Sequence, residues 1–191
     1  MTERLGILGG TFDPVHTAHV VAATEARYQL DLDRVLLVVA GDPWQKRGQV
    51  AVPAHIRHEM VTAAIAGIDG LEASTIEIDR EGPTYTIDTV EQLRAPGREL
   101  FLVVGVDTAA ALETWHRTDE LCSSVTLALV DRAGSGPEPP PGWNAVRVEI
   151  PRLDISSTDI RDRIARRAPI DGLVPPGAVR IIRERHLYNS P

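Results

Sequence analysis

The sequence predicts an α/β protein with a Rossmann-like, doubly wound and mostly parallel sheet that has helices on both faces. Apolar runs rich in β-branched residues alternate along the chain with amphipathic segments at helical spacing. The first apolar run ends in two glycines and leads directly into a helical segment, which is how open α/β sheets bind phosphate groups. At 191 residues the chain has the length of one domain, so we expect a single domain over residues 1–191.

The strands are expected at the apolar, β-branched runs, beginning with "RLGIL" at residues 4–8 and "RVLLVV" at residues 34–39. Helices are expected where the apolar spacing suits a helical face. The remaining predicted strands cover residues 71–78, 100–104 and 125–130, with a short sixth over 146–150. The predicted helices cover residues 17–30, 54–66, 86–94 and 108–115, with two more in the tail over 158–167 and 177–186.

Two segments interrupt this alternation and are predicted to be loops. They are "AGDPWQKRGQVAVP" at residues 40–53 and "DRAGSGPEPPPGWN" at residues 131–144. The second is rich in glycine and proline, so we expect an exposed connector without a function of its own.

Composition excludes several classes of protein. The net charge of −7 disfavours an extended nucleic-acid partner, although a small anion needs only a local positive pocket. The sequence has no long uncharged apolar run and its start lacks a secretory pattern, so we expect a cytoplasmic protein without a membrane partner. Cys122 is the only cysteine and can form no internal disulfide, and Lys46 is the only lysine among twenty cationic residues.

The stretch "GILGGTFDPVHTAHV" at residues 6–20 is the strongest functional signal. It lacks the third glycine of the dinucleotide fingerprint and the Gly-Lys-Ser/Thr of a P-loop, which argues against a dehydrogenase and a P-loop NTPase. His16 and His19 would face the same side of a helix, toward the ligand of the glycine turn. A metal pair and a purely structural pair are the alternatives, and "HIRH" at residues 55–58 repeats the same spacing.

Several motifs together resemble one family. "GGTFDPVHTAH" at residues 9–19 resembles the nucleotidyltransferase signature, and "ISSTDIR" at residues 155–161 resembles the second signature of that superfamily. "GPTYTIDTV" at residues 82–90 and the tail "LVPPGAVRIIRERHLY" at residues 173–188 are similar to the bacterial nicotinate mononucleotide adenylyltransferases. The segments "DPWQK" at residues 42–46 and "VVGVDTAAALETW" at residues 103–115 agree as well. Pantetheine-phosphate adenylyltransferases share the first signature but are shorter and are not expected to carry "GPTYT" or this tail.

The resemblance implies a reaction that joins ATP to nicotinate mononucleotide in NAD biosynthesis, releasing pyrophosphate, with strand order 3-2-1-4-5. His16, His19 and Lys46 are the implied catalytic residues. By the same resemblance, ATP would be bound by Gly9, Gly10, Thr11, Phe12, His16, His19, Gly105, Asp107, Ile155, Ser156, Ser157, Thr158 and Arg161.

The implied acceptor site would hold the nicotinate mononucleotide. Trp115 would stack on the pyridine ring, and the backbone around Tyr85 would meet the ring carboxylate. Asp107 could bond a ribose hydroxyl, lie near the metal, or cap a helix. Mg²⁺ would arrive with ATP, held by phosphates and water rather than by a protein metal site. The residues assigned to this acceptor are Lys46, Thr84, Tyr85, Thr86 and Trp115.

One position departs from the family pattern, because Ala18 stands where the signature has glycine between the two histidines. The added methyl group could crowd the nucleotide. Three alternatives follow from the sequence. The enzyme could prefer the amide mononucleotide or another phosphate acceptor, the chain could be a nucleotide-binding regulator without turnover, or it could be an NAD-dependent oxidoreductase.

Overall fold

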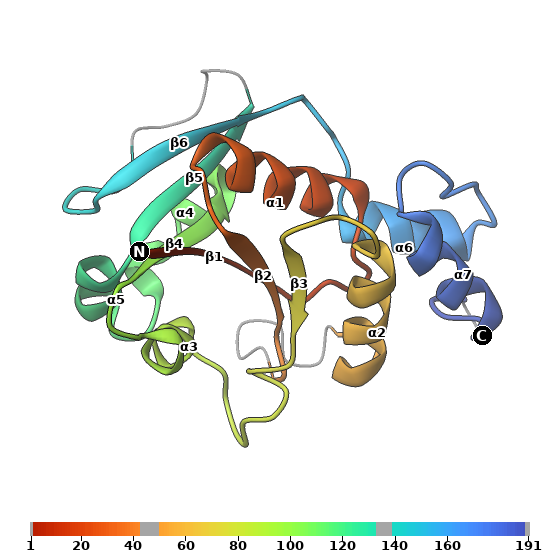
Figure 1. The fold of residues 1–191 in the computed structure, drawn as a ribbon. Coiled ribbons are helices and arrows are strands. Elements are labelled where there is room, and N and C mark those ends of the chain that lie inside the picture. The colour runs from red at the N-terminus through yellow and green to blue at the C-terminus, as the bar shows by residue number, and fades with distance from the viewer. Residues whose placement is uncertain (1, 43–49, 133–138, 190–191) are drawn as a thin grey trace.

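A computed structural model describes residues 2–42, 50–132 and 139–189 of the chain. Within them, six strands form one parallel sheet in the order β3-β2-β1-β4-β5-β6 (Figure 1). The strands are β1 (Glu3–Gly10), β2 (Arg34–Val39), β3 (Leu71–Ser74), β4 (Arg98–Gly105), β5 (Thr126–Arg132) and β6 (Ala145–Ile150). The predicted fold class and the predicted order 3-2-1-4-5 are therefore confirmed, with β6 added in parallel beyond β5.

Helices cover both faces of this sheet. They are α1 (Thr17–Gln29), α2 (Ala54–Ala64), α3 (Thr86–Leu93), α4 (Val106–Ala109), the 3₁₀ helix η2 (Leu112–Thr114), α5 (Thr118–Ser124), α6 (Ser157–Ala165) and α7 (Pro176–Glu184). In this described part of the chain, none of the helices is long and apolar enough to cross a bilayer.

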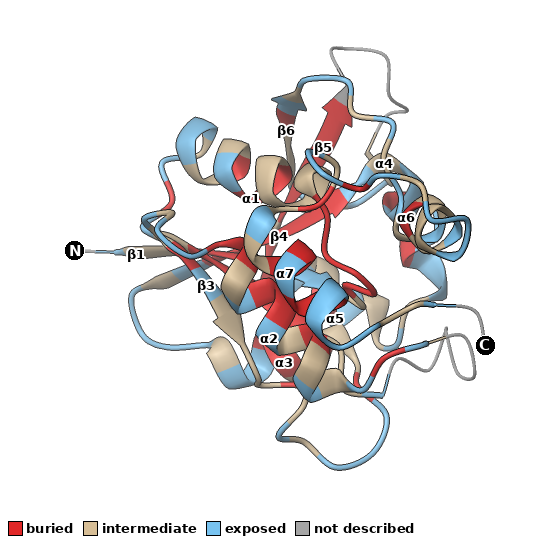
Figure 2. Cartoon of the chain, turned by 90° about the vertical axis from the view of Figure 1, so that its right-hand side faces the viewer, coloured by how far each residue is buried: buried red, intermediate tan, exposed pale blue. Residues whose placement is uncertain are grey.

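The core consists of two layers, one on each face of the sheet, because successive side chains of a strand point in opposite directions. In β2, Val35 and Leu37 pack under α1 and α2, whereas Leu36 and Val38 pack toward α3 and α5. Buried residues accordingly run along the strands and the inner sides of the helices (Figure 2). A sheet buried on both faces explains why its strands are continuous apolar runs in the sequence.

Two predicted elements differ in extent from the structure by more than two residues. The strand predicted over residues 71–78 ends at Ser74, because the Thr75 carbonyl accepts hydrogen bonds from the N–H groups of Ile78 (2.7 Å) and Asp79 (2.9 Å) and so forms a turn. The helix predicted over residues 108–115 is instead the short α4 followed by η2.

Helix α5 has no counterpart among the predicted elements. It follows Arg117, whose backbone is left-handed with φ of 52°, and its buried residue is Leu121. A seven-residue helix that buries so little carries no apolar periodicity, which is the signal that sequence reasoning needs.

Candidate active site

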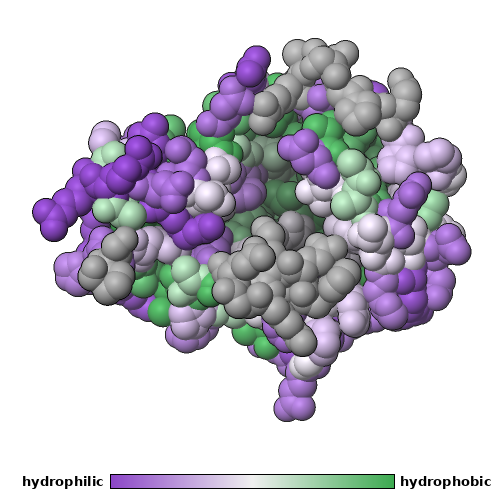
Figure 3. Space-filling view, turned by 180° about the vertical axis from the view of Figure 1, so that it is seen from behind, coloured by the Kyte–Doolittle hydropathy of each residue, from purple (hydrophilic) through white to green (hydrophobic). Residues whose placement is uncertain are grey.

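A cavity of about 510 Å³ opens at the carboxyl ends of β1 and β4. β1 pairs with β2 on one side and with β4 on the other, so the strand order reverses at this point and leaves a crevice between the two halves of the sheet. Seen from behind, the molecule is hollowed near its middle, and hydrophobic residues line the floor of the hollow (Figure 3). The cavity wall includes these predicted site residues: Gly9, Gly10, Thr11, His16, His19, Thr84, Tyr85, Thr86, Gly105, Asp107 and Trp115.

The glycine turn, residues 9–16, connects β1 to α1 and forms one wall of this cavity. A β-carbon on Gly9 would meet no atom within 4 Å, so the backbone at this position is open to a ligand. A β-carbon on Gly10 would lie 2.9 Å from the ring of Phe12, which is only 2% exposed. The two glycines therefore serve different purposes. Gly9 exposes the backbone, and Gly10 makes room for a buried aromatic ring.

His16 and His19 lie together at the start of α1. Their rings stack with centroids 3.6 Å apart, and the ring of Phe12 meets His19 edge-on at 4.9 Å. The His16 backbone N–H donates to Nδ1 of His19 at 3.2 Å. Because Nδ1 accepts this bond, the neutral His19 ring carries its proton on Nε2, where it is a hydrogen-bond donor.

The His16 ring is 6% exposed, and burial lowers its pKa to about 4. The ring is therefore neutral near pH 7, so any contribution to phosphate binding comes from an N–H donor rather than from a charge. His16 also occupies the N-cap position of α1, where its side chain and that of His19 form a capping box with the backbone of the first turn.

Across the cavity, the start of α3 and the two residues that follow η2 form the opposite wall. Tyr85 precedes α3 in an extended conformation, and its ring tilts against His116 with centroids 4.3 Å apart. Trp115 directly follows η2 and is partly buried against the core. This wall therefore offers aromatic surface together with the N-terminal turn of an eight-residue helix.

Gly105 and Asp107 lie at the rim, where β4 ends and α4 begins. Both are exposed, and Asp107 is in the first turn of α4. In the chain that the structure describes, no cluster of three or more histidine, cysteine, aspartate or glutamate residues could hold a metal ion.

The second signature lies beside the glycine turn rather than in the wall of the cavity. Ser156 caps α6 and accepts a hydrogen bond from the Asp159 N–H at 3.0 Å. The hydroxyl of Ser157 donates to the Pro14 carbonyl at 2.9 Å, and Arg161 donates to the Asp13 carbonyl at 2.7 Å. The other members of the predicted set that do not line the cavity are Phe12, Ile155 and Thr158. Lys46 lies outside the described residues.

Sequence reasoning missed two charged residues of this region. Glu77 lines the cavity at 8% exposure, accepts a hydrogen bond from the Thr89 hydroxyl at 2.8 Å, and has a pKa raised by burial. Arg57 is 1% exposed and donates to four backbone carbonyls behind the glycine turn, three of them within 2.9 Å. Glu77 is part of a polar stretch, and Arg57 lies between the two histidines of "HIRH". Neither residue type nor spacing therefore distinguishes them in the sequence.

Comparison with known proteins identifies the family that this sequence matches. The family model described as cytidylyltransferase-like matches residues 7–163. A Corynebacterium kroppenstedtii protein named "Probable nicotinate-nucleotide adenylyltransferase" is 44% identical over 97% of this chain and 90% of its own length. A Streptomyces coelicolor protein of the same name is 44% identical over 96% of this chain and 100% of its own length.

Solved structures agree in fold. Plasmodium falciparum nicotinic acid mononucleotide adenylyltransferase complexed with NaAD superposes with a TM-score of 0.80 at 19% identity, covering 97% of each chain. The same protein complexed with APC gives a TM-score of 0.77 at the same identity and coverage. At this identity the likeness concerns the arrangement of the elements.

Proposed function

This chain belongs to the cytidylyltransferase-like family, and the relatives described above are named nicotinate-nucleotide adenylyltransferases. On that basis we propose that it joins ATP to nicotinate mononucleotide. The products are nicotinate adenine dinucleotide and pyrophosphate, and the setting is NAD biosynthesis in the cytoplasm. The whole chain would act as one nucleotidyltransferase domain.

One observation carries the proposal. The same cavity has the glycine turn and two histidines on one wall, and Tyr85 and Trp115 on the other. Phosphates fit the first wall because it offers open backbone and N–H donors, and a flat heterocycle fits the aromatic second wall. The crevice where a doubly wound sheet reverses its strand order is also where such folds bind nucleotides.

The reaction needs no catalytic base, because the mononucleotide phosphate is already ionised. One of its oxygens forms a bond to the α-phosphorus of ATP, and the bond from that phosphorus to the α,β-bridging oxygen breaks. The remaining work is to align two anions and to stabilise charge on the phosphoryl oxygens. The Nε2–H group of His19 would donate to an α-phosphate oxygen, and His16 would contact ATP phosphates through an N–H.

Lys46 and the metal complete the proposed site. We assign Lys46 to charge neutralisation on the approaching phosphates. Mg²⁺ would come with ATP and offset negative charge on the phosphates, and Asp107 would either lie near this metal or bond a ribose hydroxyl. Ser156 and Thr158, with the N-terminal turn of α6, would supply further phosphate donors beside the glycine turn.

The test is pyrophosphate release from ATP and Mg²⁺ with three acceptors: nicotinate mononucleotide, its amide, and 4'-phosphopantetheine. We expect fast release with the first. Release with only one of the other two acceptors would mean that the proposed acceptor is wrong. Absence of release with all three would favour a nucleotide-binding regulator without turnover. An absorbance change with NAD and candidate alcohols would favour the oxidoreductase.

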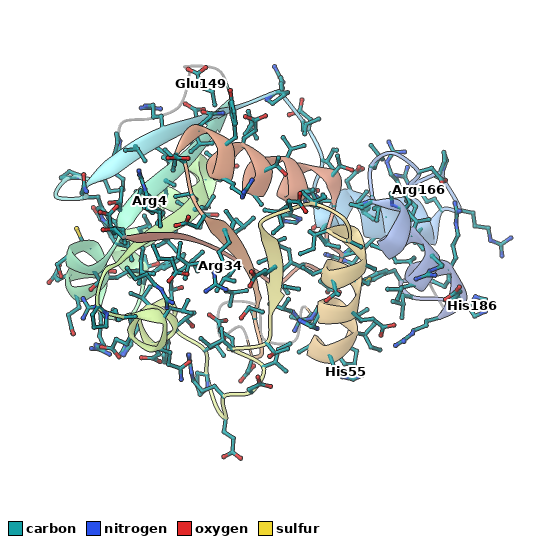
Figure 4. The ribbon with its side chains drawn as sticks, in the orientation of Figure 1. Arg4, Arg34, His55, Glu149, Arg166 and His186 are labelled. Atoms are coloured by element: carbon teal, nitrogen blue, oxygen red, sulfur yellow. The ribbon has the colours of Figure 1, made fainter. Side chains whose placement is uncertain are left out.

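His19→Ala tests the assigned role within the same assay. Losing a hydrogen-bond donor to the transition state lowers kcat by about 10²–10³-fold, with a small change in thermal stability. His55→Ala is the matched control, because His55 is an exposed histidine at the start of α2 (Figure 4). Equal loss of turnover and stability in His19→Ala would instead mark this histidine as structural.

A further inference from the structure

We propose that Arg57 is a positioning residue for ATP: from behind the glycine turn, its guanidinium holds the backbone carbonyl of Thr11 away from the phosphate site. Arg57 does not line the cavity, so it would act through the turn rather than by touching the nucleotide. The inference rests on the proposed function, because it takes the glycine turn to be the ATP-phosphate site.

The guanidinium of Arg57 joins three separate segments of the chain. From α2, Nε donates to the Val52 carbonyl at 2.9 Å, Nη1 to the Thr11 carbonyl at 2.5 Å, and Nη2 to the Ala40 carbonyl at 2.7 Å. Ala40 follows β2, and its own N–H donates to the Gly10 carbonyl at 2.9 Å. A planar group with five donors can bond three carbonyls in different directions, which the single ammonium of lysine cannot reproduce.

Burying this charge is costly unless its donors are bonded and an opposite charge is near. The Asp13 carboxylate provides that opposite charge. Burial lowers the pKa of the Arg57 guanidinium, and the nearby Asp13 and Tyr188 offset part of this lowering. Asp13 is 3% exposed and accepts from the Tyr188 hydroxyl and from the Ala51 N–H, each at 2.7 Å. Tyr188, near the end of the chain, therefore holds the counter-charge of Arg57 in place.

Three carbonyls of the glycine turn are bonded by side chains from other elements. Arg57 binds the carbonyl of Thr11, Arg161 that of Asp13, and Ser157 that of Pro14. In a trans peptide the C=O of one residue and the N–H of the next point in opposite directions. Directing the Thr11 carbonyl toward Arg57 thus turns the Phe12 N–H away from Arg57. Carbonyl oxygens repel phosphate, so this orientation favours an anion in the cavity.

The experiment measures binding of the ATP analogue α,β-methylene ATP with Mg²⁺ by calorimetry, on full-length variants shown to be folded by circular dichroism. Arg57→Lys keeps the positive charge but removes the planar guanidinium with its several N–H donors. Tyr188→Phe removes the hydroxyl that donates a hydrogen bond to Asp13. Arg166→Lys and Tyr28→Phe are matched controls, since Arg166 is exposed on the C-terminal side of α6 (Figure 4) and Tyr28 is 82% exposed. Leu32→Ala controls for lost stability, because Leu32 is a buried core residue that does not line the cavity.

We expect Arg57→Lys to weaken analogue binding by at least about tenfold and Tyr188→Phe by about threefold, with all three controls within about twofold of the parent protein. Reverting the Arg57→Lys variant to the parent sequence must restore the affinity. A folded Arg57→Lys that binds within about twofold of the parent would overturn the proposal, as would an equal loss in Leu32→Ala. If Arg57→Lys does not fold, Tyr188→Phe decides between the same outcomes.

Failure of this inference is distinguishable from failure of the proposed function. A parent protein that binds the analogue but releases no pyrophosphate with any acceptor contradicts the proposed reaction, and the binding comparison still decides the role of Arg57. A parent protein that does not bind the analogue contradicts both.

Discussion

Ala18 lies in the first turn of α1 and lines the cavity, at the position where the nucleotidyltransferase signature has glycine. Its methyl group takes up space next to the two histidines. We therefore expect Ala18→Gly to tighten ATP binding or leave it unchanged, measured as the dissociation constant by calorimetry. The same change costs about 1 kcal/mol of stability, since glycine is the poorer helix former.

Clear weakening of ATP binding in Ala18→Gly would contradict the crowding argument, because it would mean that the turn has repacked around the methyl group. Ala165→Gly is a suitable control for the helix effect, since Ala165 is exposed at the end of α6. It should lose stability without a change in ATP affinity.

The burial of His16 leads us to expect that the free energy of unfolding decreases as the pH is lowered. The pKa of this histidine is about 4 in the folded protein and about 6.5 when exposed, so the unfolded chain binds more protons between these values. Stability from this group is fully present above pH 6.5 and falls as the pH is lowered toward 4, by as much as about 3 kcal/mol. Urea unfolding of His16→Gln at about pH 7, 6 and 5 should show a shallower decline than the parent.

His55→Gln supplies the control for this measurement, because it makes the same replacement at an exposed position. Equal slopes for His16→Gln and the parent would mean that His16 is not the group that titrates. Residue-scale chemistry of this kind depends on burial. The sequence identified His16 as a candidate, but only the packed structure shows that the ring is neutral near pH 7.

At the scale of elements, the packing of α7 on α2 brings distant parts of the chain to the glycine turn. α2 carries Arg57, and the segment after α7 carries Tyr188. The two helices approach closely at Gly177, where a β-carbon would overlap the Ala63 carbonyl. Glycine is required at this position by space rather than by backbone conformation.

Gly177→Ala should therefore destabilise the protein by about 1–3 kcal/mol, although alanine is the better helix former. The measurement is the free energy of unfolding in urea. Arg180→Ala, at an exposed position of the same helix, should stay within about 0.5 kcal/mol of the parent. A Gly177→Ala variant as stable as the parent would show that the two helices can separate without cost.

The boundaries of several elements were predictable from the sequence. β2 runs over its predicted residues, and α1 and α3 each end one residue earlier than expected. The larger errors fall in β3, η2 and α5, whose residues do not line the cavity. Trp115 was predicted at the end of a helix and instead follows η2, yet it still lines the cavity.

For the whole molecule, the cavity at the reversal point of the sheet predicts stabilisation by both substrates. A ligand at about 100 times its dissociation constant adds about 2.7 kcal/mol to the free energy of unfolding. For a chain of this length that corresponds to a rise in Tm of roughly 5–10 °C. We expect such a rise, measured by calorimetry, with Mg²⁺-ATP and with nicotinate mononucleotide.

Thermal shifts also separate the acceptors. 4'-Phosphopantetheine should leave Tm unchanged, because it has no flat ring to place on the wall formed by Tyr85 and Trp115. A shift with ATP and none with nicotinate mononucleotide would contradict the acceptor assignment, although it would keep the nucleotide site.

The sequence by itself determined the α/β class, the strand order through its resemblance, and the signature residues of the glycine turn. These follow from local patterns, since periodicity and motif spacing are properties of neighbouring residues. Only the tertiary structure decided which residues support that turn. Arg57, Asp13 and Tyr188 lie in separate parts of the chain, yet the Tyr188 hydroxyl donates to the Asp13 carboxylate and the charge of Asp13 acts on the Arg57 guanidinium. Burial and long-range contacts fix the charge of His16 and the direction of the Thr11 carbonyl, and neither is written in any short stretch of sequence.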